Sequence, residues 1–586
     1  MIPALKKRHA TKALIALTLY CLLFSLPSSV SAHAYIVASS PGENEVLEEA
    51  PAQVSITFNE PIEQAFHSIQ VTDSSGQQAT AGESRMDDAH SARLIADLKP
   101  ELPDGIYTVN YKVLSSDGHT VTGTFPFIIG DAAAAAHNPA DANQPGSSQG
   151  QDWPKLSLLL LRWLQYSGLA IYIGVLLFHL LLLPQRRSIA ESAARRLQNH
   201  PYALAKSPVW QRSKQLLILS LLLAAAGIGL SLPQQAASDA GVPWSQAWNP
   251  AWIKDTLSLT SFGKAWTAEM ILLLMLAGLT AALIIFTKKQ SRLAADLTAA
   301  AALLTTLGIL LAKSFIGHAA AASGRSMAIA MNFLHQASSF LWLGGLLSLA
   351  LLLPAAAEAT RSSSGSRSQL YWEAIRRFSI LAAGCVAILL CSGVYAGMLH
   401  IPTWYALLHS NYGLILLAKS GLTLVMLALG LSAFMRGRRR TRPLGRGVWI
   451  EFVTGLIVLV LAAILSNMPT ALSSPGPIQL KAVTADGYHI SVQVSPNTVG
   501  ENRIEVTALD REQKPLNGIE QITLTLTSLD MDMGTIELAI PGRSDSIPLN
   551  GNAIVTRGGS WRLQVHILLS SLDSVDSSFT FQVGNK

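Results

Sequence analysis

The chain has 586 residues, of which 50% are hydrophobic and only 14% are charged, and its formal net charge is +6. A water-soluble protein carries about 25% charged residues, so the composition excludes a wholly soluble globular protein. The basic residues fall in short clusters between apolar runs, where membrane topology accounts for them. We therefore expect no nucleic-acid partner.

Residues 1–32 have the pattern of a secretory signal peptide. A basic segment precedes an apolar stretch, and Val30-Ser31-Ala32 places small or β-branched residues at the positions that a signal peptidase requires. Cleavage after Ala32 makes His33 the first residue of the mature chain, whereas cleavage after Ala34 removes that histidine. An uncleaved anchor is a third interpretation, although the apolar stretch is short for a membrane span.

Two regions alternate polar and apolar residues in the way that predicts antiparallel β-sandwiches. Residues 33–130 contain "QVSITFNE" and "GIYTVNYKVLSSDG", which are short alternating segments separated by turn residues. Residues 476–586 repeat this pattern in "YHISVQVSP" and "ITLTLTSLD", and predict an Ig-like sandwich. Between the first sandwich and the membrane, residues 131–153 are rich in Ala, Pro, Gly and Ser and predict a flexible tether.

Residues 154–470 predict an α-helical membrane domain with eight spans, each long enough to cross a bilayer. Basic residues gather in the loops after the first, third, fifth and seventh spans, which is the positive-inside bias. If the first sandwich is extracytoplasmic, an even number of spans returns the C-terminus to the same side. The fold class is thus a multi-pass plasma-membrane protein with two extracytoplasmic β-sandwiches. The predicted spans are 156–184, 214–234, 265–287, 295–316, 329–353, 378–399, 411–435 and 446–467.

The segment Ser115-Ser116-Asp117-Gly118-His119 carries a candidate metal site. If the segment is extended, Asp117 and His119 lie two residues apart and face the same side. A mature N-terminal His33 would add an α-amine and a second imidazole. Two imidazoles, an amine and a carboxylate form a tetragonal set of nitrogen and oxygen ligands that favours Cu(II). The alternative is a structural turn, because Asp-Gly is a strong hairpin-turn dipeptide.

Three stretches of the first sandwich, "HAYIVASSPGENEVLEEAP", "ITFNEPIE" and "YKVLSSDGHTVTGTFPFIIG", together resemble the CopC family of exported copper-binding domains. The resemblance implies that His33, Asp117 and His119 are copper ligands. It also implies that Glu60 lies near the site, behind the ligands. We expect His67 to be a surface residue rather than a ligand.

A second candidate metal cluster lies in the membrane domain, where polar side chains are costly and usually functional. Met327, Met331 and His335 recur at every fourth position and therefore share one helical face. His318 ends the fourth span on the same, outer side. Thioether and imidazole ligands suit Cu(I) and tolerate Cu(II). The alternative is that the two methionines fill gaps in the core, whereas an imidazole within a span needs a partner.

The stretches "GHA", "LHQASSFLWLGGL", "NYGLILLAKSGL" and "EF" at 451–452 resemble the CopD family of copper-transport membrane proteins over roughly residues 155–470. We expect the tryptophan and the glycines among the matching positions to serve close helix packing. The matching positions are His318, His335, Trp342, Gly344 and Gly345.

Two charged residues, Glu269 and Lys419, lie within the third and seventh predicted spans. They could pair with each other or relay a proton, and the sequence does not decide between these alternatives.

The C-terminal sandwich resembles YtkA-like domains through "LDMDMG" and "GGSWRLQVHI". In this region Met531 and Met533 share a predicted strand face and could bind copper weakly. Packing or partner docking is the alternative role, and it is the one that we expect.

The sequence therefore predicts a CopC–CopD fusion that takes up copper across the plasma membrane and has no enzymatic activity. Cu(II) bound outside at the His33 site would pass to the His/Met cluster of the core, where Cu(I) is the candidate ion. The sequence contains no Walker-type phosphate-binding motif, so transport would be passive or ion-coupled. Expected partners are copper ions, the lipid bilayer and copper chaperones. The alternatives are copper sequestration, resistance or sensing without transport, and a haem or copper redox membrane protein.

Overall fold

The computed structural model describes two β regions and a helical core, with gaps. The predicted signal peptide, the tether and the site residues His33, Glu60, Asp117 and His119 lie outside the described residues, as do Met531 and Met533. The described residues are 36–43, 45–59, 61–115, 118, 120–130, 155–183, 207–321, 325–358, 364–439, 446–484, 486–529, 535–542, 548–555 and 558–584.

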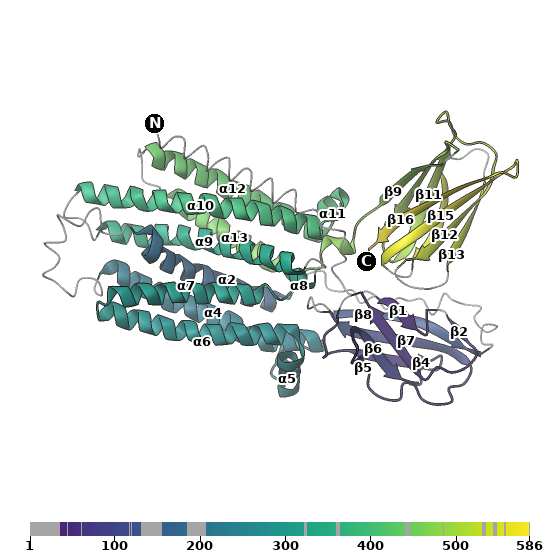
Figure 1. The fold of residues 1–586 in the computed structure, drawn as a ribbon, viewed down its shortest axis with the longest axis horizontal. Helices are drawn as coiled ribbons and strands as arrows, with labels where there is room; N and C mark the ends of the chain where they lie inside the picture. The colour runs from purple at the N-terminus through teal and green to yellow at the C-terminus, as the bar shows by residue number, and fades with distance from the viewer. Residues whose placement is uncertain are drawn as a thin grey trace. The chain divides into compact units, whose positions relative to one another are not determined.

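The first β region is a sandwich of two four-stranded sheets, with strand orders β1-β3-β6-β5 and β2-β8-β7-β4 (Figure 1). Alternating burial explains the pairing of the sheets: in β3, Val54, Ile56 and Phe58 point into one shared core. This arrangement confirms the predicted N-terminal sandwich. The strands are β1 (Ile36–Ser40), β2 (Val46–Leu47), β3 (Gln53–Phe58), β4 (Ser68–Asp73), β5 (Arg85–Asp87), β6 (His90–Asp97), β7 (Gly105–Leu114) and β8 (Thr120–Ile129).

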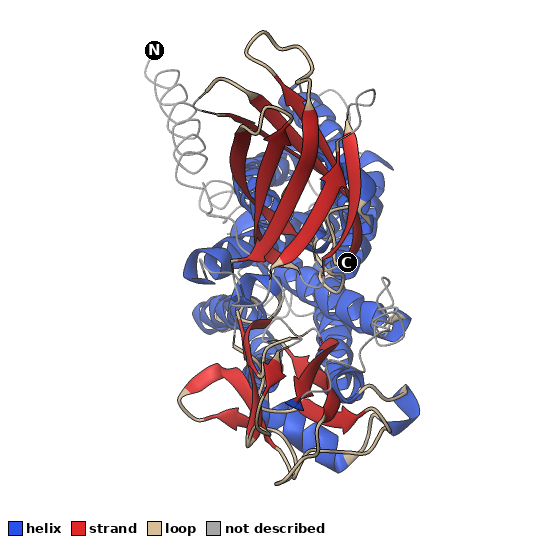
Figure 2. Ribbon diagram, turned by 90° about the vertical axis from the view of Figure 1, so that its right-hand side faces the viewer, coloured by secondary structure: helices blue, strands red, loops and turns tan. Residues whose placement is uncertain are grey.

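The C-terminal β region is a second sandwich, with sheet orders β14-β11-β10-β9 and β13-β12-β15-β16. Its core is built around Trp561 on β15, which is fully buried. Figure 2 shows the long, twisted strands of this region in red. The strands are β9 (Ile478–Val483), β10 (His489–Ser495), β11 (Gly500–Leu509), β12 (Ile519–Ser528), β13 (Ile536–Pro541), β14 (Leu549–Val555), β15 (Gly559–Leu569) and β16 (Ser574–Val583).

Eight helices of the described chain are long and apolar enough to cross a membrane, which is the number predicted from the sequence. Local signals set several of their ends. Ser207 caps the start of α4 by accepting a hydrogen bond from the Trp210 N–H, and the left-handed Gly241 ends that helix. The spanning helices are α2 (Leu156–Leu177, continued to Leu182 by a π-helical turn), α4 (Pro208–Ala240), α6 (Ser261–Lys288), α7 (Arg292–Lys313), α9 (Arg325–Glu358), α10 (Ser364–His400), α12 (Asn411–Arg439) and α13 (Arg446–Leu465). Shorter helices are α5 (Pro250–Leu259), α8 (His318–Ala321) and α11 (Trp404–His409).

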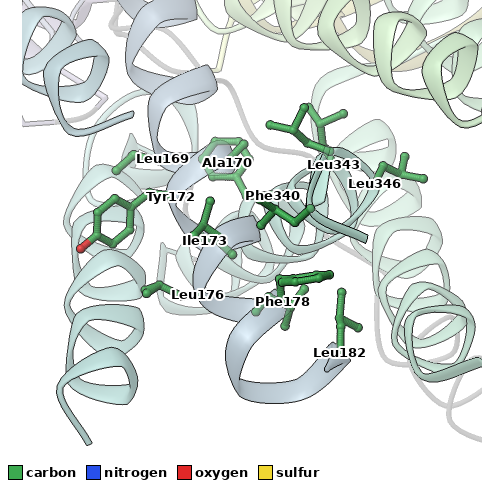
Figure 3. Close-up of a cluster of buried hydrophobic side chains, with 14 of the residues drawn as sticks. Leu169, Ala170, Tyr172, Ile173, Leu176, Phe178, Leu182, Phe340, Leu343 and Leu346 are labelled. Carbon is green, nitrogen blue, oxygen red and sulfur yellow. The ribbon is translucent and has the colours of Figure 1, made fainter. Parts of the chain in front are cut away.

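Helix α2 packs closely against α4 and α9 because glycines line both crossings. A Cβ added at Gly168 would lie 2.7 Å from the backbone of α4, and one added at Gly174 would lie 2.1 Å from the carbonyl oxygen of Gly344 on α9. Figure 3 shows the apolar side chains of α2 meeting Phe340 and Leu343 of α9. The expected packing role of Gly344 is therefore confirmed.

Helices α10 and α12 are far less enclosed than α9. In the most apolar stretch of each helix, 78% of the residues of α9 are buried, against 22% for α10 and 6% for α12. Few residues in these stretches of α10 and α12 are therefore buried by the rest of the chain. The end of the helical core at which α2 begins and α13 ends is called the linker end.

Helix α11 joins α10 to α12 and contacts the segment that leads into the C-terminal sandwich. The Thr403 hydroxyl donates a hydrogen bond of 2.6 Å to the carbonyl oxygen of Pro475. Gly476, with φ +81°, lies against the Tyr405 ring, where any Cβ would clash. The short connection between α10 and α12 is thus attached to the start of the second sandwich.

Candidate metal sites

Three segments that carry the predicted ligands converge in the first sandwich. Ile36, three residues after His33, pairs with Phe58 at the end of β3. Ile62 pairs in turn with Ser115 at the end of β7. Because three extended residues reach about 10 Å, the described neighbours of His33, Glu60, Asp117 and His119 all lie around the segment from Phe58 to Ile62.

A hydrogen bond between Gly118 and Ser115 lies at the end of β7. The Gly118 N–H donates to the Ser115 carbonyl oxygen at 2.9 Å, and Gly118 has φ +89°. This geometry agrees with the turn alternative that the sequence raised for Asp-Gly. Asp117 and His119 themselves lie outside the described residues, in the connection between β7 and β8.

His67 is half-buried rather than fully exposed. Its Nδ1 lies 3.0 Å from the Ser84 hydroxyl oxygen. Burial lowers the pKa of His67 below its ordinary value of 6.5, although a backbone hydrogen bond at Gln64 and the charge of Glu83 oppose this shift. The position is a structural one within the sandwich.

In the helical core, Met331 and His335 both point from α9 toward α10. Met331 is buried in a small cluster with Tyr395 and Leu399 of α10. His335 Nδ1 lies 2.9 Å from Ser392 Oγ. Met327, one turn nearer the linker end, is 44% exposed. The predicted ladder therefore runs from an exposed methionine into the interface between α9 and α10.

The hydrogen bonds around His335 define which of its nitrogens can bind a metal. Ser392 Oγ donates its single proton to the Ile388 carbonyl oxygen at 2.6 Å. The bond between Ser392 and His335 therefore uses the imidazole Nδ1–H as donor. In the neutral ring this tautomer leaves the lone pair on Nε2, which is the form of histidine that ligates metals. Lys419 of α12 lies within electrostatic range of the same ring.

His318 makes a different contact from His335. Its Nε2–H donates to the carbonyl oxygen of Met468, which follows α13, at 3.1 Å. Among the described residues, no three His, Cys, Asp or Glu side chains converge as ligands of one metal ion. A site at the linker end would therefore need the methionine sulfur atoms as well.

A buried charged cluster, missed in the sequence, joins three helices and the segment that follows α13 near the linker end. Glu269 on α6 accepts a hydrogen bond of 2.7 Å from Gln165 on α2. Lys313 on α7 lies 3.8 Å from the same carboxylate, and both charged side chains are at least nine-tenths buried. Arg162 on α2 acts electrostatically on Glu269 and donates to the carbonyl and hydroxyl oxygens of Ser466 beyond α13.

Of the two alternatives raised for Glu269, pairing with Lys419 is not observed, because Lys313 takes that place. The signal in the sequence was available: an arginine, a glutamine, a glutamate and a lysine each occur in the half of a predicted span that lies toward the linker end. What the sequence lacked was the rotation of each helix about its axis, which decides which of these side chains face one another.

Trp342 also has a polar partner that the sequence did not indicate. Its indole forms a side-chain hydrogen bond with Glu451 on α13, and both residues are buried. Gly345, one turn further along α9, leaves room for the Phe378 ring, because a Cβ there would lie 2.4 Å from that ring. The expected packing role is confirmed for Gly345, whereas Trp342 combines packing with hydrogen bonding.

The chain matches three family models along its length. Residues 36–130 match the CopC domain, residues 152–328 match the N-terminal domain of copper resistance protein D-like proteins, and residues 372–465 match copper resistance protein D. Together these matches cover the first sandwich and most of the helical core.

Individual relatives agree with these matches. The chain is 32% identical over 569 residues to "Copper transport protein CutJ" of Bacillus subtilis (strain 168), covering 96% of this chain and 98% of that protein. The first sandwich is 29% identical over 101 residues to "Protein YobA" of Escherichia coli (strain K12), covering 17% of this chain and 82% of that protein. Among solved structures, CopC from Methylosinus trichosporium OB3b shows 33% identity and a TM-score of 0.16, covering 17% of this chain and 93% of that one.

Proposed function

Because this chain belongs to the family of fused CopC–CopD copper transport and resistance proteins, we propose that it carries copper inward across the plasma membrane. In this proposal the two β-sandwiches face the extracytoplasmic side. The even number of spanning helices and the basic residues of the alternate loops support that orientation.

The first step is the capture of Cu(II) by the N-terminal sandwich. The ligands are the α-amine and imidazole of His33, the carboxylate of Asp117 and the imidazole of His119, with Glu60 behind them. The convergence of Ile36, Ile62 and Ser115 supports this set, because these described residues adjoin all four. The tether raises the local concentration of the loaded domain at the membrane.

The second step is transfer of copper to the helical core at the linker end. His318, Met327, Met331 and His335 form the accepting cluster in this proposal. The observation that carries it is the hydrogen bonding of His335, which leaves the Nε2 lone pair available in a span. Thioether sulfur atoms and a neutral imidazole favour Cu(I) and tolerate Cu(II).

The ligand types of the core favour a path along α9 over one between α2, α6 and α7. The carboxylate of Glu269 is already paired with Lys313 and hydrogen-bonded to Gln165, and neither Lys313 nor Arg162 is a ligand for copper. The face of α9 toward α10 instead presents sulfur and nitrogen ligands.

The test is uptake of radioactive copper into cells that carry His335→Ala, with His409→Ala as the matched control. His409 is an exposed histidine of α11 that stacks on Tyr405 and has no place in the proposed path. We expect His335→Ala to lower the initial rate of uptake and the control to leave it unchanged. If the His335→Ala protein moves copper as well as the intact protein, the proposed path is wrong.

A further inference from the structure

The ligand face of α9 continues beyond His335 toward the opposite end of the core. Trp342 lies seven residues after His335, which is almost two full turns, so it shares the face of Met327, Met331 and His335. From Met327 to Trp342 the helix rises about 22 Å, which is most of a hydrocarbon core of about 30 Å.

Glu451 is the polar group that the structure places at the inner part of this face. Its side chain is 3% exposed, and among the described residues its hydrogen-bond donor is the Trp342 indole, with no paired cation. Gly430 on α12 makes room for it: a Cβ at that position would lie 3.3 Å from Glu451 Oε1. A buried carboxylate within a membrane span is costly and is usually retained for function.

Met426 lies one helical turn from Gly430 on α12 and faces the same contact with α13. Its methyl carbon would lie 3.2 Å from a Cβ at Gly455, which is one turn from Glu451. Gly430 of α12 thus lies opposite Glu451 of α13, and Gly455 of α13 lies opposite Met426 of α12. Leu343 of α9, next to Trp342, also lies against Gly455. The thioether of Met426 and the carboxylate of Glu451 therefore lie within one turn of each other beside α9.

This pair of side chains has the chemistry of a second copper station. A thioether is a soft ligand that suits Cu(I), and a single carboxylate offsets one unit of positive charge, which is the whole charge of that ion. Two ligands bind weakly, as a transport path requires, because an ion held by a full ligand set would not leave. A purely structural role explains the buried Met426 but not a carboxylate beside it.

We infer that Glu451 and Met426 form a copper-binding station in the inner half of the helical core, which receives copper from His335 and is positioned by Trp342. This inference rests on the proposed function. The station lies where α9 and α13 meet α12, the helix with the smallest buried share in its most apolar stretch among the eight spanning helices of the described chain. A small movement of α12 would open it toward the opposite end of the core.

The first experiment measures Cu(I) binding to the purified full-length protein, with ascorbate as reductant and a competing chelator. The variants are Glu451→Gln, which can still accept the Trp342 hydrogen bond, and Met426→Leu, which conserves volume and so preserves packing. The matched controls are Met435→Leu on the exposed side of α12 and Glu373→Gln, whose carboxylate pairs with Arg376 and Arg377. We expect both station variants to lose one bound Cu(I) and both controls to retain it. Unchanged binding in Met426→Leu and in a folded Glu451→Gln would overturn the inference.

The second experiment measures Cu(I) entry into liposomes that contain the same proteins. We expect the station variants to lower the initial rate by about tenfold, equivalent to about 1.4 kcal/mol. If the intact protein moves copper and the station variants match it, the inference fails while the proposed function stands. If the intact protein moves none, the proposed function fails, and the binding measurement still decides whether the station exists.

Discussion

A single methyl group at Gly344 perturbs the closest helix crossing of the core. In Gly344→Ala, the new Cβ would lie 2.2 Å from the carbonyl oxygen of Ala170 and 2.8 Å from the backbone nitrogen of Gly174. A carbon and an oxygen in contact need more than 3 Å, so α2 and α9 must separate by roughly 1 Å. Both neighbours are backbone atoms of a helix and cannot rotate away.

Separation at this crossing loosens the most buried part of the core. Overpacking costs about 1–3 kcal/mol, and more where rigid backbones meet. Leu169, Ile173 and Phe340 lose contacts as the helices move apart. We therefore expect Gly344→Ala to be destabilised by about 2–3 kcal/mol.

The assay is unfolding of the purified full-length protein in detergent, followed by the exposure of Cys385, which is buried in α10 and not in a disulfide. The controls are Gly229→Ala and Gly278→Ala, where an added Cβ has no atom within 4 Å. Because alanine is the better helix former by about 1 kcal/mol, these variants should be neutral or slightly more stable. If Gly344→Ala is as stable as these controls, the close crossing of α2 and α9 is wrong.

Two further predictions concern charged and titratable groups. Glu269→Gln leaves Lys313 and Arg162 buried without a carboxylate, so we expect a loss of about 3–5 kcal/mol. Adding Lys313→Met should recover part of that loss in an unfolding measurement, and a double variant less stable than Glu269→Gln would contradict the ion pair. For His67, burial places the pKa of the folded state below the value of 6.5 in the unfolded chain. The unfolded chain therefore takes the proton first, so the stability that depends on neutral His67 is present above pH 6.5 and is lost below it. Hydrogen exchange of β3 and β6 in the intact protein, corrected for intrinsic rates, should show less acid sensitivity in His67→Gln, and equal sensitivity in both proteins would refute this assignment.

The elements were predictable because their signals are local and strong. A run of apolar residues such as that of α6 directly predicts a membrane span. The alternation of polar and apolar residues in β3 or β12 directly predicts a half-buried strand. The number of spanning helices and both sandwiches followed from these patterns.

The contacts between helices were not predictable, because hydropathy gives the length and direction of a span but not its rotation. Lys313 rather than Lys419 lies beside Glu269, and only the packing of α6 against α7 decides between them. In the sequence, nothing distinguishes Met426 from the other apolar residues of its span. Its proximity to Glu451 becomes apparent only from the packing of α12 against α13. At the first sandwich, Gly118 has the left-handed backbone of a turn, which the extended interpretation of its segment did not include.

The central claim is inward copper transport, and cytoplasmic copper in cells grown at limiting copper tests it most directly. Cells with and without the protein are compared by a cytoplasmic copper-responsive probe and by total metal after removal of the cell envelope. The proposed function predicts more cytoplasmic copper when the protein is present, and loss of the difference in His335→Ala. Equal or lower cytoplasmic copper in cells that contain the protein would contradict uptake and would favour sequestration or export.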